Sequence, residues 1–243
     1  MSHHEKRIAV WSGPRNISTA LMRSFENRED TSVLDEPFYA HYLHTTGINH
    51  PGKNEILETQ KIIWDEIVDY IKGPIPNNKP IWYQKHMAQH NTEGNDLSWT
   101  KCMDNLFLIR EPEEVIASYY SIFPIDDDLL LGFKQQKELF KYILETTGKI
   151  SPVINSRTIL TNPKKALKKL CGCLDIKFSE KMLKWPPGTR KSDGIWAKYW
   201  YKNVINSSGF KKYKKKEVTI TSKMQPLVDR CRSSYEYLKQ YQI

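Results

Sequence analysis

Short apolar runs along this chain alternate with longer stretches in which apolar residues recur at the spacing of one helix face. The short runs predict buried strands, and the longer stretches predict amphipathic helices. We expect strands at 7–12, 31–35, 81–85, 105–110 and about 152–160. We expect helices from about Ser18, over about 54–72, from Pro112, over about 129–147, from Pro163 and from about Ser222.

Strands that alternate with helices are typical of a parallel sheet with helices on both faces. Because no internal repeat or linker interrupts the pattern, we expect a single α/β domain over residues 1–243 with a mostly parallel central sheet. A chain of 243 residues buries enough apolar surface to fold without a disulfide or metal staple. The stretch from Trp185 to Phe210 is expected to be a long surface loop, and loops of that length are usually functional or disordered.

The composition narrows the class of protein. With 39% hydrophobic and 27% charged residues, it is typical of a globular domain. The four cysteines include no C-x-x-C pair and no histidines stand at zinc-finger spacing, which argues against a disulfide framework and a structural zinc. The N-terminus is polar, and no apolar run approaches the ~20 residues that span a bilayer. We expect a soluble, cytoplasmic protein with no membrane partner.

The charge is unevenly distributed along the chain. Residues 1–150 hold 16 basic and 22 acidic side chains, whereas residues 151–243 hold 21 and 6. Such an asymmetry is typical of a protein that binds an anionic ligand or a polyanion. The lysine runs at 164–169 and 211–216 lack the interleaved aromatic residues and glycines of a nucleic-acid module, so we interpret them as solvated faces and expect no nucleic-acid partner.

The turn after the first predicted strand leads directly into a helix. Such a helix N-terminus offers unpaired backbone N–H groups and a partial positive charge to a phosphate group. Arg15 adds a guanidinium suited to phosphate or sulfate, although Ser18 could simply cap the helix. The loop is not a Walker A motif, because no lysine precedes Ser18 and Thr19. The candidate anion-binding residues here are Arg15, Asn16, Ile17, Ser18, Thr19 and Ala20.

A second candidate anion site follows the fourth predicted strand. Residues 110–119 read R-x-P-x-E-x-x-x-S-Y, which places Arg110 at the strand end and Ser118 on the next helix. In a parallel sheet, both side chains can converge on one phosphate at the carboxyl edge of the strands.

These two motifs together resemble the sulfotransferase superfamily. Its members share an R-x-P-x-(D/E)-x-x-x-S arrangement for the 3′-phosphate of 3′-phosphoadenosine 5′-phosphosulfate, and their first loop binds the 5′-phosphosulfate, often as (R/K)-x-x-(S/T)-(S/T). Arg15, Ser18 and Thr19 match that loop. Further segments are similar to a subgroup of small sulfotransferase-like proteins, some with aminotransferase-like names: Asp35 to Phe38, Gln84 to His90 and Gly194 to Tyr201.

The resemblance implies a P-loop NTPase-like fold and the transfer of a sulfuryl group from 3′-phosphoadenosine 5′-phosphosulfate to a hydroxyl or amine of a small-molecule acceptor. It implies no metal, because sulfuryl carries less charge than phosphoryl. The chain departs from many members in lacking the basic-basic-glycine signature that adds a further clamp on the 3′-phosphate. Arg190 and Lys191, before Gly194, are the candidate substitute.

Sulfuryl transfer requires charge stabilisation on the leaving oxygen and a general base for the acceptor proton. Arg15 and Lys85 are the candidate cations. Glu36 is our first choice for the base, because it ends a strand near the phosphate loop and several superfamily members use a glutamate there. His86 is the second choice and His90 the third, with an ion pair or a core position as the structural alternative for each.

The acceptor pocket and the class of activity leave alternatives open. Tyr39, His90 and Trp196 are candidate acceptor-binding residues, with simple core packing as the competing interpretation. The alternative functions are a P-loop small-molecule kinase and a catalytically idle nucleotide- or nucleic-acid-binding protein on the same scaffold. A pyridoxal-phosphate aminotransferase fits less well, because only Lys85 stands out as a candidate Schiff-base lysine.

Overall fold

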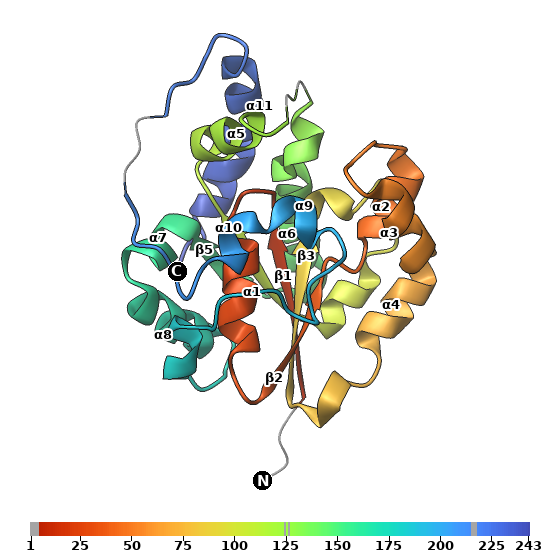
Figure 1. Cartoon of the computed structure of the whole chain (residues 1–243), viewed down its shortest axis with the longest axis vertical. Helices are drawn as coiled ribbons and strands as arrows, with labels where there is room; N and C mark the ends of the chain where they lie inside the picture. Colours follow the sequence, from red (N-terminus) through yellow and green to blue (C-terminus); the bar gives the residue numbers. More distant parts are fainter. Residues whose placement is uncertain (1–4, 124, 126, 215–217) are drawn as a thin grey trace.

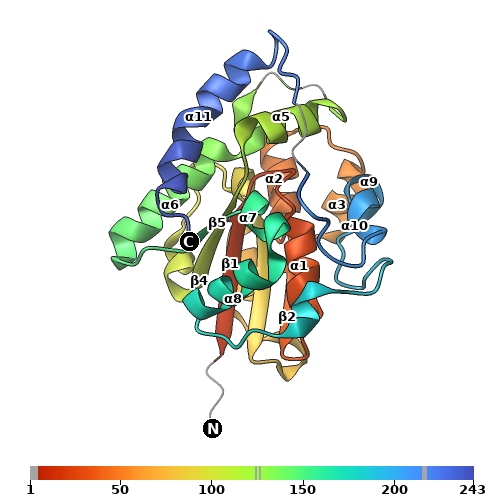
Figure 2. The same ribbon diagram turned by 90° about the vertical axis from the view of Figure 1, so that its left-hand side faces the viewer.

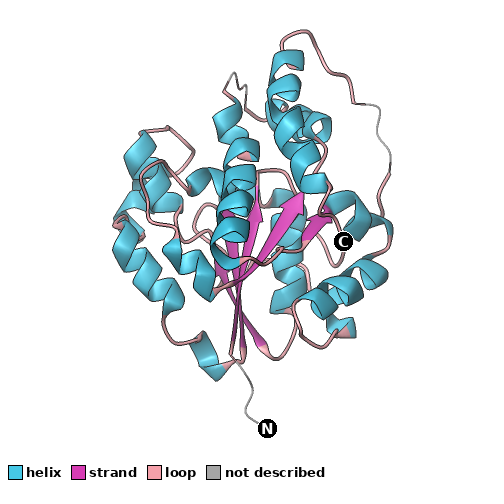
Figure 3. Ribbon diagram, turned by 180° about the vertical axis from the view of Figure 1, so that it is seen from behind, coloured by secondary structure: helices cyan, strands magenta, loops and turns pink. Residues whose placement is uncertain are grey.

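A parallel sheet forms the centre of the molecule. The computed structural model describes residues 5–123, 125, 127–214 and 218–243, and within them five strands pair in the order β2-β3-β1-β4-β5, all parallel. Figure 3 shows the strands enclosed by helices. The strands are β1 (Lys6–Ser12), β2 (Thr31–Asp35), β3 (Ile81–Met87), β4 (Asp104–Ile109) and β5 (Val153–Asn155). The predicted α/β architecture is therefore confirmed.

Helices connect the strands and cover both faces of the sheet (Figures 1 and 2). None of the helices in the described part of the chain is both long enough and apolar enough to cross a membrane. The helices are α1 (Ser18–Glu26), α2 (Tyr39–Thr46), α3 (Lys53–Thr59), α4 (Trp64–Lys72), α5 (Pro112–Tyr120), α6 (Phe133–Thr147), α7 (Ser156–Thr161), α8 (Pro163–Cys173), α9 (Ala197–Trp200), α10 (Lys202–Ile205) and α11 (Gln225–Lys239).

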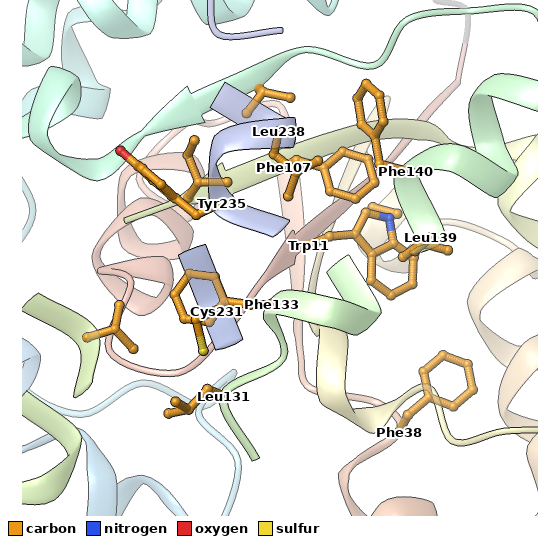
Figure 4. Close-up of a cluster of buried hydrophobic side chains, with 14 of the residues drawn as sticks. Trp11, Phe38, Phe107, Leu131, Phe133, Leu139, Phe140, Cys231, Tyr235 and Leu238 are labelled. Carbon is orange, nitrogen blue, oxygen red and sulfur yellow. The ribbon is translucent and has the colours of Figure 1, made fainter. Parts of the chain in front are cut away.

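The two faces of the sheet carry separate hydrophobic cores, because successive side chains of a strand point to opposite sides. On one face, Ile8 and Val10 of β1 pack in a cluster with side chains of α1 and α8. On the other, Trp11 of β1 and Phe107 of β4 pack with residues of α6 and α11, as Figure 4 shows. The same alternation along β3 sends neighbouring residues to different surroundings, which decides the composition of the site described below.

The predicted helix over 54–72 is in fact two helices, α3 and α4. Gln60 after α3 and Ile63 before α4 both have extended backbone conformations. The apolar residues of the two helices belong to different cores: Ile56 packs with residues of α2, whereas Trp64 packs on Phe38 with ring centroids 4.1 Å apart. Tertiary packing therefore divides a stretch whose helical period is continuous.

The predicted strand over about 152–160 ends at Asn155. The side chain of Asn155 accepts a hydrogen bond from the backbone N–H of Arg157 at 2.8 Å and so caps α7, which takes the following residues. The helix predicted over 129–147 begins only at Phe133, because Gly132, with φ 73°, separates it from a short 3-10 turn.

The stretch from Trp185 to Phe210 is not simply a surface loop. It contains α9 and α10, and its side chains Trp185, Trp196 and Tyr201 are buried. Burial of each such aromatic side chain stabilises the packed segment by roughly 1.5–3 kcal/mol. The segment is thereby fixed against the end of the sheet where the strands terminate.

Candidate functional site

A cavity of about 1160 Å³ opens where the strands end at their carboxyl edge. It is lined by the loop after β1, the residues that follow β2, the end of β3, one side of α5 and parts of the segment from Trp200 to Thr219. This is the edge at which parallel α/β sheets bind ligands, because loops and helix N-termini from several strands converge there.

The loop after β1 presents the N-terminus of α1 to the cavity. Arg15 and Ile17 both have left-handed backbone conformations, with φ 61° and 58°. Ile17 stands at the cap position and no side chain caps the helix, so the first N–H groups of α1 are not used by a side chain. Ser18 is therefore not the cap. Left-handed residues other than glycine are strained and concentrate at functional sites.

The two predicted anion-binding arginines lie together. Arg110 Nη1 donates to the backbone oxygen of Arg15 at 2.7 Å, and Arg15 Nε donates to Ser118 Oγ at 2.9 Å. Both arginines and Ser118 line the cavity. Burial and the charge of Arg110 lower the pKa of Arg15, so the ionised pair is an environment that favours a bound anion. Two stretches of chain about 95 residues apart thus form one basic site.

Glu114 connects this basic site to the C-terminal part of the chain. It accepts hydrogen bonds from Arg110 Nε at 2.9 Å, from the Tyr213 hydroxyl at 2.8 Å and from Arg157 Nη2 at 3.1 Å. The lysines beside Tyr213 line the cavity: Lys211, Lys212 and Lys214. These lysines were expected to form a solvated face, and only the charge of the run could have indicated a site. Lys215 and Lys216 of the run lie outside the described residues.

Arg190 and Lys191, predicted as a further clamp, do not line the cavity. Arg190 Nη2 donates to the Pro186 oxygen at 2.7 Å, and its Nε lies 3.7 Å from Glu26 Oε2. The structure therefore does not bring these two residues together with Arg110. The lysines beside Tyr213 occupy the cavity wall instead.

At the ends of β2 and β3, Lys85 lies among three oxygen acceptors. Asp35 is the register partner of Lys85 across the two strands, and its Oδ1 accepts from Lys85 Nζ at 2.9 Å. Glu36 Oε1 and the Tyr201 hydroxyl, at 2.7 Å, accept the other hydrogens of the ammonium. Glu36 reaches this position through a left-handed backbone conformation, φ 43°, that is held by a 2.9 Å hydrogen bond from its N–H to the Lys85 oxygen.

Burial sets the protonation of this cluster. It raises the pKa of Glu36 above its ordinary value, and the Asp35 carboxylate adds to the effect while the Lys85 ammonium opposes it. Burial alone would lower the pKa of Lys85, but the Asp35 and Glu36 carboxylates outweigh it, so the pKa of Lys85 is raised. Burial and the two carboxylates likewise raise the pKa of Tyr201, which remains a neutral phenol.

Aromatic and imidazole rings form the cavity wall beside Glu36. His90 stacks on Tyr39, with ring centroids 4.9 Å apart, and its Nε2 lies 4.0 Å from Glu36 Oε2. The Tyr39 hydroxyl and His50 Nδ1 are 2.9 Å apart. Burial lowers the pKa of both histidines, that of His50 to about 4, so both rings are neutral near pH 7. Tyr39 and His90 were among the predicted acceptor-binding residues and line the cavity; His50 also lines it, and no local motif marks it.

Two further predicted site residues, besides Arg190 and Lys191, lie away from the cavity. His86 points to the opposite face of β3 from Lys85 and stacks on Trp11 with ring centroids 4.5 Å apart. Burial lowers its pKa to about 3. Trp196 is also buried and does not line the cavity, but its Nε1 donates to the Tyr201 hydroxyl at 3.1 Å. It therefore supports a cavity residue and does not itself form the wall.

Comparisons with solved structures support the fold. The sulfotransferase from Alicyclobacillus acidocaldarius matches with a TM-score of 0.52 and 10% identity over 98% of this chain and 97% of its own. The sulfotransferase domain from the curacin biosynthetic pathway matches with a TM-score of 0.50 and 14% identity over 94% and 98%. At such low identity the likeness concerns the fold, and it confirms the predicted P-loop-like sulfotransferase architecture.

Sequence comparisons show the family of the chain as well as its fold. Branched-chain-amino-acid aminotransferase-like proteins 1 and 2 of Arabidopsis thaliana are 33% and 32% identical to this chain, in each case over 96% of it. The chain spans less than half of these relatives, 42% and 41% of their lengths. The family model described as a sulfotransferase domain matches residues 6–223. The chain therefore belongs to the sulfotransferase domain family.

Proposed function

We propose that this chain transfers a sulfuryl group from 3′-phosphoadenosine 5′-phosphosulfate to a hydroxyl or amine of a small-molecule acceptor. The observation that carries the proposal is the joining of Arg15 and Arg110 in one cavity through a 2.7 Å hydrogen bond. Two guanidinium groups beside an uncapped helix N-terminus fit a compound with phosphate groups at both of its ends.

The donor set of the cavity divides naturally between the two ends of such a compound. The N-terminus of α1, with Arg15, Ser18 and Thr19, would hold the 5′-phosphosulfate. Arg110 and Ser118 would hold the 3′-phosphate, and the three cavity lysines beside Tyr213 would supply the additional positive charge. This assignment gives the basic run near the C-terminus a role that the sequence analysis assigned to Arg190 and Lys191.

When bound, the phosphosulfate supplies an activated sulfuryl group, whose S–O bond to the 5′-phosphate breaks as a new bond forms from sulfur to the acceptor oxygen or nitrogen. Glu36 takes the proton of the acceptor hydroxyl or amine and later returns it to water. Arg15 and Lys85 stabilise the negative charge that remains on the 5′-phosphate. Tyr39, His50 and His90 form the wall against which the acceptor lies.

The state of Lys85 argues against the aminotransferase activity in the names of the Arabidopsis relatives. A lysine forms a Schiff base through its neutral amine, so such lysines have lowered pKa values. Lys85 instead lies between the Asp35 and Glu36 carboxylates, which raise its pKa and keep it an ammonium. The kinase alternative lacks a lysine in the loop after β1.

Binding of adenosine 3′,5′-bisphosphate, the donor without its sulfuryl group, tests the proposal. We expect the wild-type protein to bind it more tightly than adenosine 5′-monophosphate, as measured by calorimetry. Arg110→Ala removes a charged hydrogen-bond donor, and a bond of that kind contributes roughly 1.5–3 kcal/mol, so affinity for the bisphosphate should fall about 10- to 100-fold. Affinity for the monophosphate should change much less.

Arg190→Ala is the matched control, because Arg190 is an arginine outside the cavity. It should leave both affinities near those of the wild type, and thermal unfolding should show that both variants fold. Equal affinity of the wild-type protein for the two nucleotides would contradict the 3′-phosphate site. Transfer of labelled sulfate from the donor to members of an acceptor library would then test the reaction itself.

A further inference from the structure

All three hydrogens of the Lys85 ammonium are in use. An ammonium has three donors and no acceptor. Asp35 Oδ1, the Tyr201 hydroxyl and Glu36 Oε1 each accept one of them. Although Lys85 lines the cavity, it has no hydrogen left for an anion until one of these bonds breaks.

Two of the three bonds belong to a closed, buried ring. The Tyr201 hydroxyl accepts from Lys85 and from Trp196 Nε1, and it donates its only hydrogen to Asp35 at 2.7 Å. Asp35 also accepts the backbone N–H of Gly194 at 3.2 Å. Asp35 and Tyr201 are thus each fixed by at least one partner besides Lys85. Breaking the bond from Lys85 to either of them would cost a buried hydrogen bond that no water can replace.

The bond to Glu36 is different. The Glu36 side chain lines the cavity and is 11% exposed, whereas the Asp35 side chain is 1% exposed. The Tyr201 hydroxyl lies 3.4 Å from Glu36 Oε1, but its hydrogen is directed at Asp35. His90 Nε2, at 4.0 Å from Oε2, is beyond hydrogen-bond distance. Among the described residues, Lys85 therefore provides the main hold on the Glu36 side chain.

We propose that Tyr201 and Asp35 are positioning residues that retain two hydrogens of Lys85, so that the third passes from Glu36 to the anionic donor when it binds. This inference rests on the proposed function above. Under this arrangement, Glu36 is released from Lys85 only when the donor binds. Before binding, Glu36 is an ion-pair partner; after binding, it is an unpaired carboxylate beside the acceptor.

The loss of its cation makes Glu36 a stronger base. The other groups that face it are Asp35 on β2, Tyr201 after α9, Tyr39 on α2 and His90 after β3. Burial keeps the two phenols and the imidazole uncharged near pH 7. Without Lys85, burial and the Asp35 charge would both favour the protonated form of Glu36. Donor binding should therefore raise the pKa of Glu36, so that protons are taken up at pH values near that pKa, while above it the carboxylate stays ionised and can act as the base.

Calorimetry of adenosine 3′,5′-bisphosphate in buffers of different ionisation enthalpy measures this uptake. We expect the wild-type protein to take up more protons per bound nucleotide than Glu36→Gln. Protons that bind to the phosphates of the nucleotide contribute to both proteins, so the difference between them reports Glu36. As the pH falls, the affinity of the wild-type protein for the bisphosphate should also rise more steeply than that of Glu36→Gln.

Tyr201→Phe isolates the positioning role. It removes one acceptor from Lys85 and leaves the ammonium a spare hydrogen, which can bind the nucleotide while Glu36 stays paired. We expect the excess proton uptake to disappear and kcat to fall, with no loss of nucleotide affinity. Tyr83→Phe is the matched control: its buried hydroxyl has no hydrogen-bond partner among the described residues, and the change should leave the uptake as in the wild type.

The outcomes separate this inference from the proposed function. Failure of the wild-type protein to bind the bisphosphate overturns both. Binding with equal proton uptake in the wild type and Glu36→Gln overturns only the inference, as does a wild-type excess that persists in Tyr201→Phe. Even if Tyr201→Phe does not fold, the comparison of the wild type with Glu36→Gln decides whether nucleotide binding changes the protonation of Glu36.

Discussion

Lys85 and His86 are neighbours on β3 and are equally buried, each 1% exposed, yet they lie in opposite surroundings. Lys85 points to the face that carries the cavity and is surrounded by oxygen atoms of Asp35, Glu36 and Tyr201. His86 points to the other face and lies between aromatic rings, Trp11 among them. The alternation of the strand thus separates a charged cluster from an aromatic core within two residues.

The difference shows that burial by itself does not identify a functional side chain. Lys85 keeps its charge inside the protein because two carboxylates and a phenol compensate the loss of water. His86 has no charged partner among the described residues: its Nε2 lies 3.2 Å from Gln84 Oε1, and burial lowers its pKa to about 3 so that it remains neutral. A buried charge held by partners at a cavity edge therefore points to chemistry, whereas a buried neutral imidazole among rings points to packing.

The largest effect on stability and activity is expected when the positive charge of Lys85 is removed. Lys85→Met leaves Asp35 and Glu36 buried without their cation, and breaking a buried ion pair in this way costs roughly 3–5 kcal/mol. We expect the free energy of unfolding, measured with urea near pH 7, to fall by about that amount, and sulfuryl transfer to be lost.

Lys72→Met is the control for that experiment. Lys72 pairs with Asp69 at 3.6 Å on the surface, and exposed pairs of this kind contribute about 0–1 kcal/mol. A similar small loss for both variants would show that the buried cluster is not held together by its charges.

The second effect concerns the acid side of the reaction's pH profile. Glu36 must be ionised to accept a proton, and burial raises its pKa above the ordinary value of a glutamate. The rate should therefore decline as the pH falls through that raised pKa, at a higher pH than for an exposed glutamate. Glu36→Gln should lower kcat by roughly 10²–10⁴ and remove this decline.

Nucleotide affinity distinguishes loss of the base from loss of the site. In Glu36→Gln, the binding of adenosine 3′,5′-bisphosphate near pH 7 should remain within a few-fold of the wild type, at about 1 kcal/mol or less. An unchanged kcat with the same acid decline would instead assign the base to His90, the other titratable candidate at this part of the cavity.

Much of the fold, and the gathering of Arg15 and Arg110 at the proposed anion site, could be predicted because the signals are local. The loop from Gly13 to Ile17 lies between β1 and α1, and Arg110 directly follows β4, so both are placed at the same edge of any parallel sheet. The same rule places Glu36 beside Lys85. Even the position of His86 could have been inferred, since a strand that directs Lys85 into the cavity must direct the next residue away from it.

Contacts between distant segments could not be predicted in this way. Tyr201 meets Lys85 across 116 residues. Trp196 donates to the Tyr201 hydroxyl and Gly194 donates to Asp35, and no period or motif specifies these contacts. Arg190 was the candidate substitute for a family signature that the chain lacks, yet its side chain reaches Pro186 and lies near Glu26. The packing of the segment after Trp185 therefore decides which basic residues line the cavity.

The smallest effect is expected on the aromatic face, where His86→Phe keeps a ring among rings. Near pH 7 the activity should remain. The larger ring and the lost contact with Gln84 Oε1 should cost about 1–3 kcal/mol of unfolding free energy. The dependence of the unfolding free energy on pH should become weaker below pH 6.5. Between the ordinary pKa of histidine, 6.5, and the value of about 3 in the fold, the unfolded chain binds a proton that folded His86 does not.

Because the unfolded state binds more protons in this range, His86 contributes a loss of stability as the pH falls below 6.5, of about 1.4 kcal/mol per pH unit. His86→Phe removes that contribution, so its unfolding free energy should decline less steeply from pH 6.5 to 5, as urea titrations can measure. His50 and His90 keep part of the decline, since burial lowers their pKa values too. A slope equal to that of the wild type would contradict the neutral, buried state of His86. Loss of sulfuryl transfer in a folded His86→Phe would instead return that histidine to the reaction, and the division between the two faces of β3 would no longer hold.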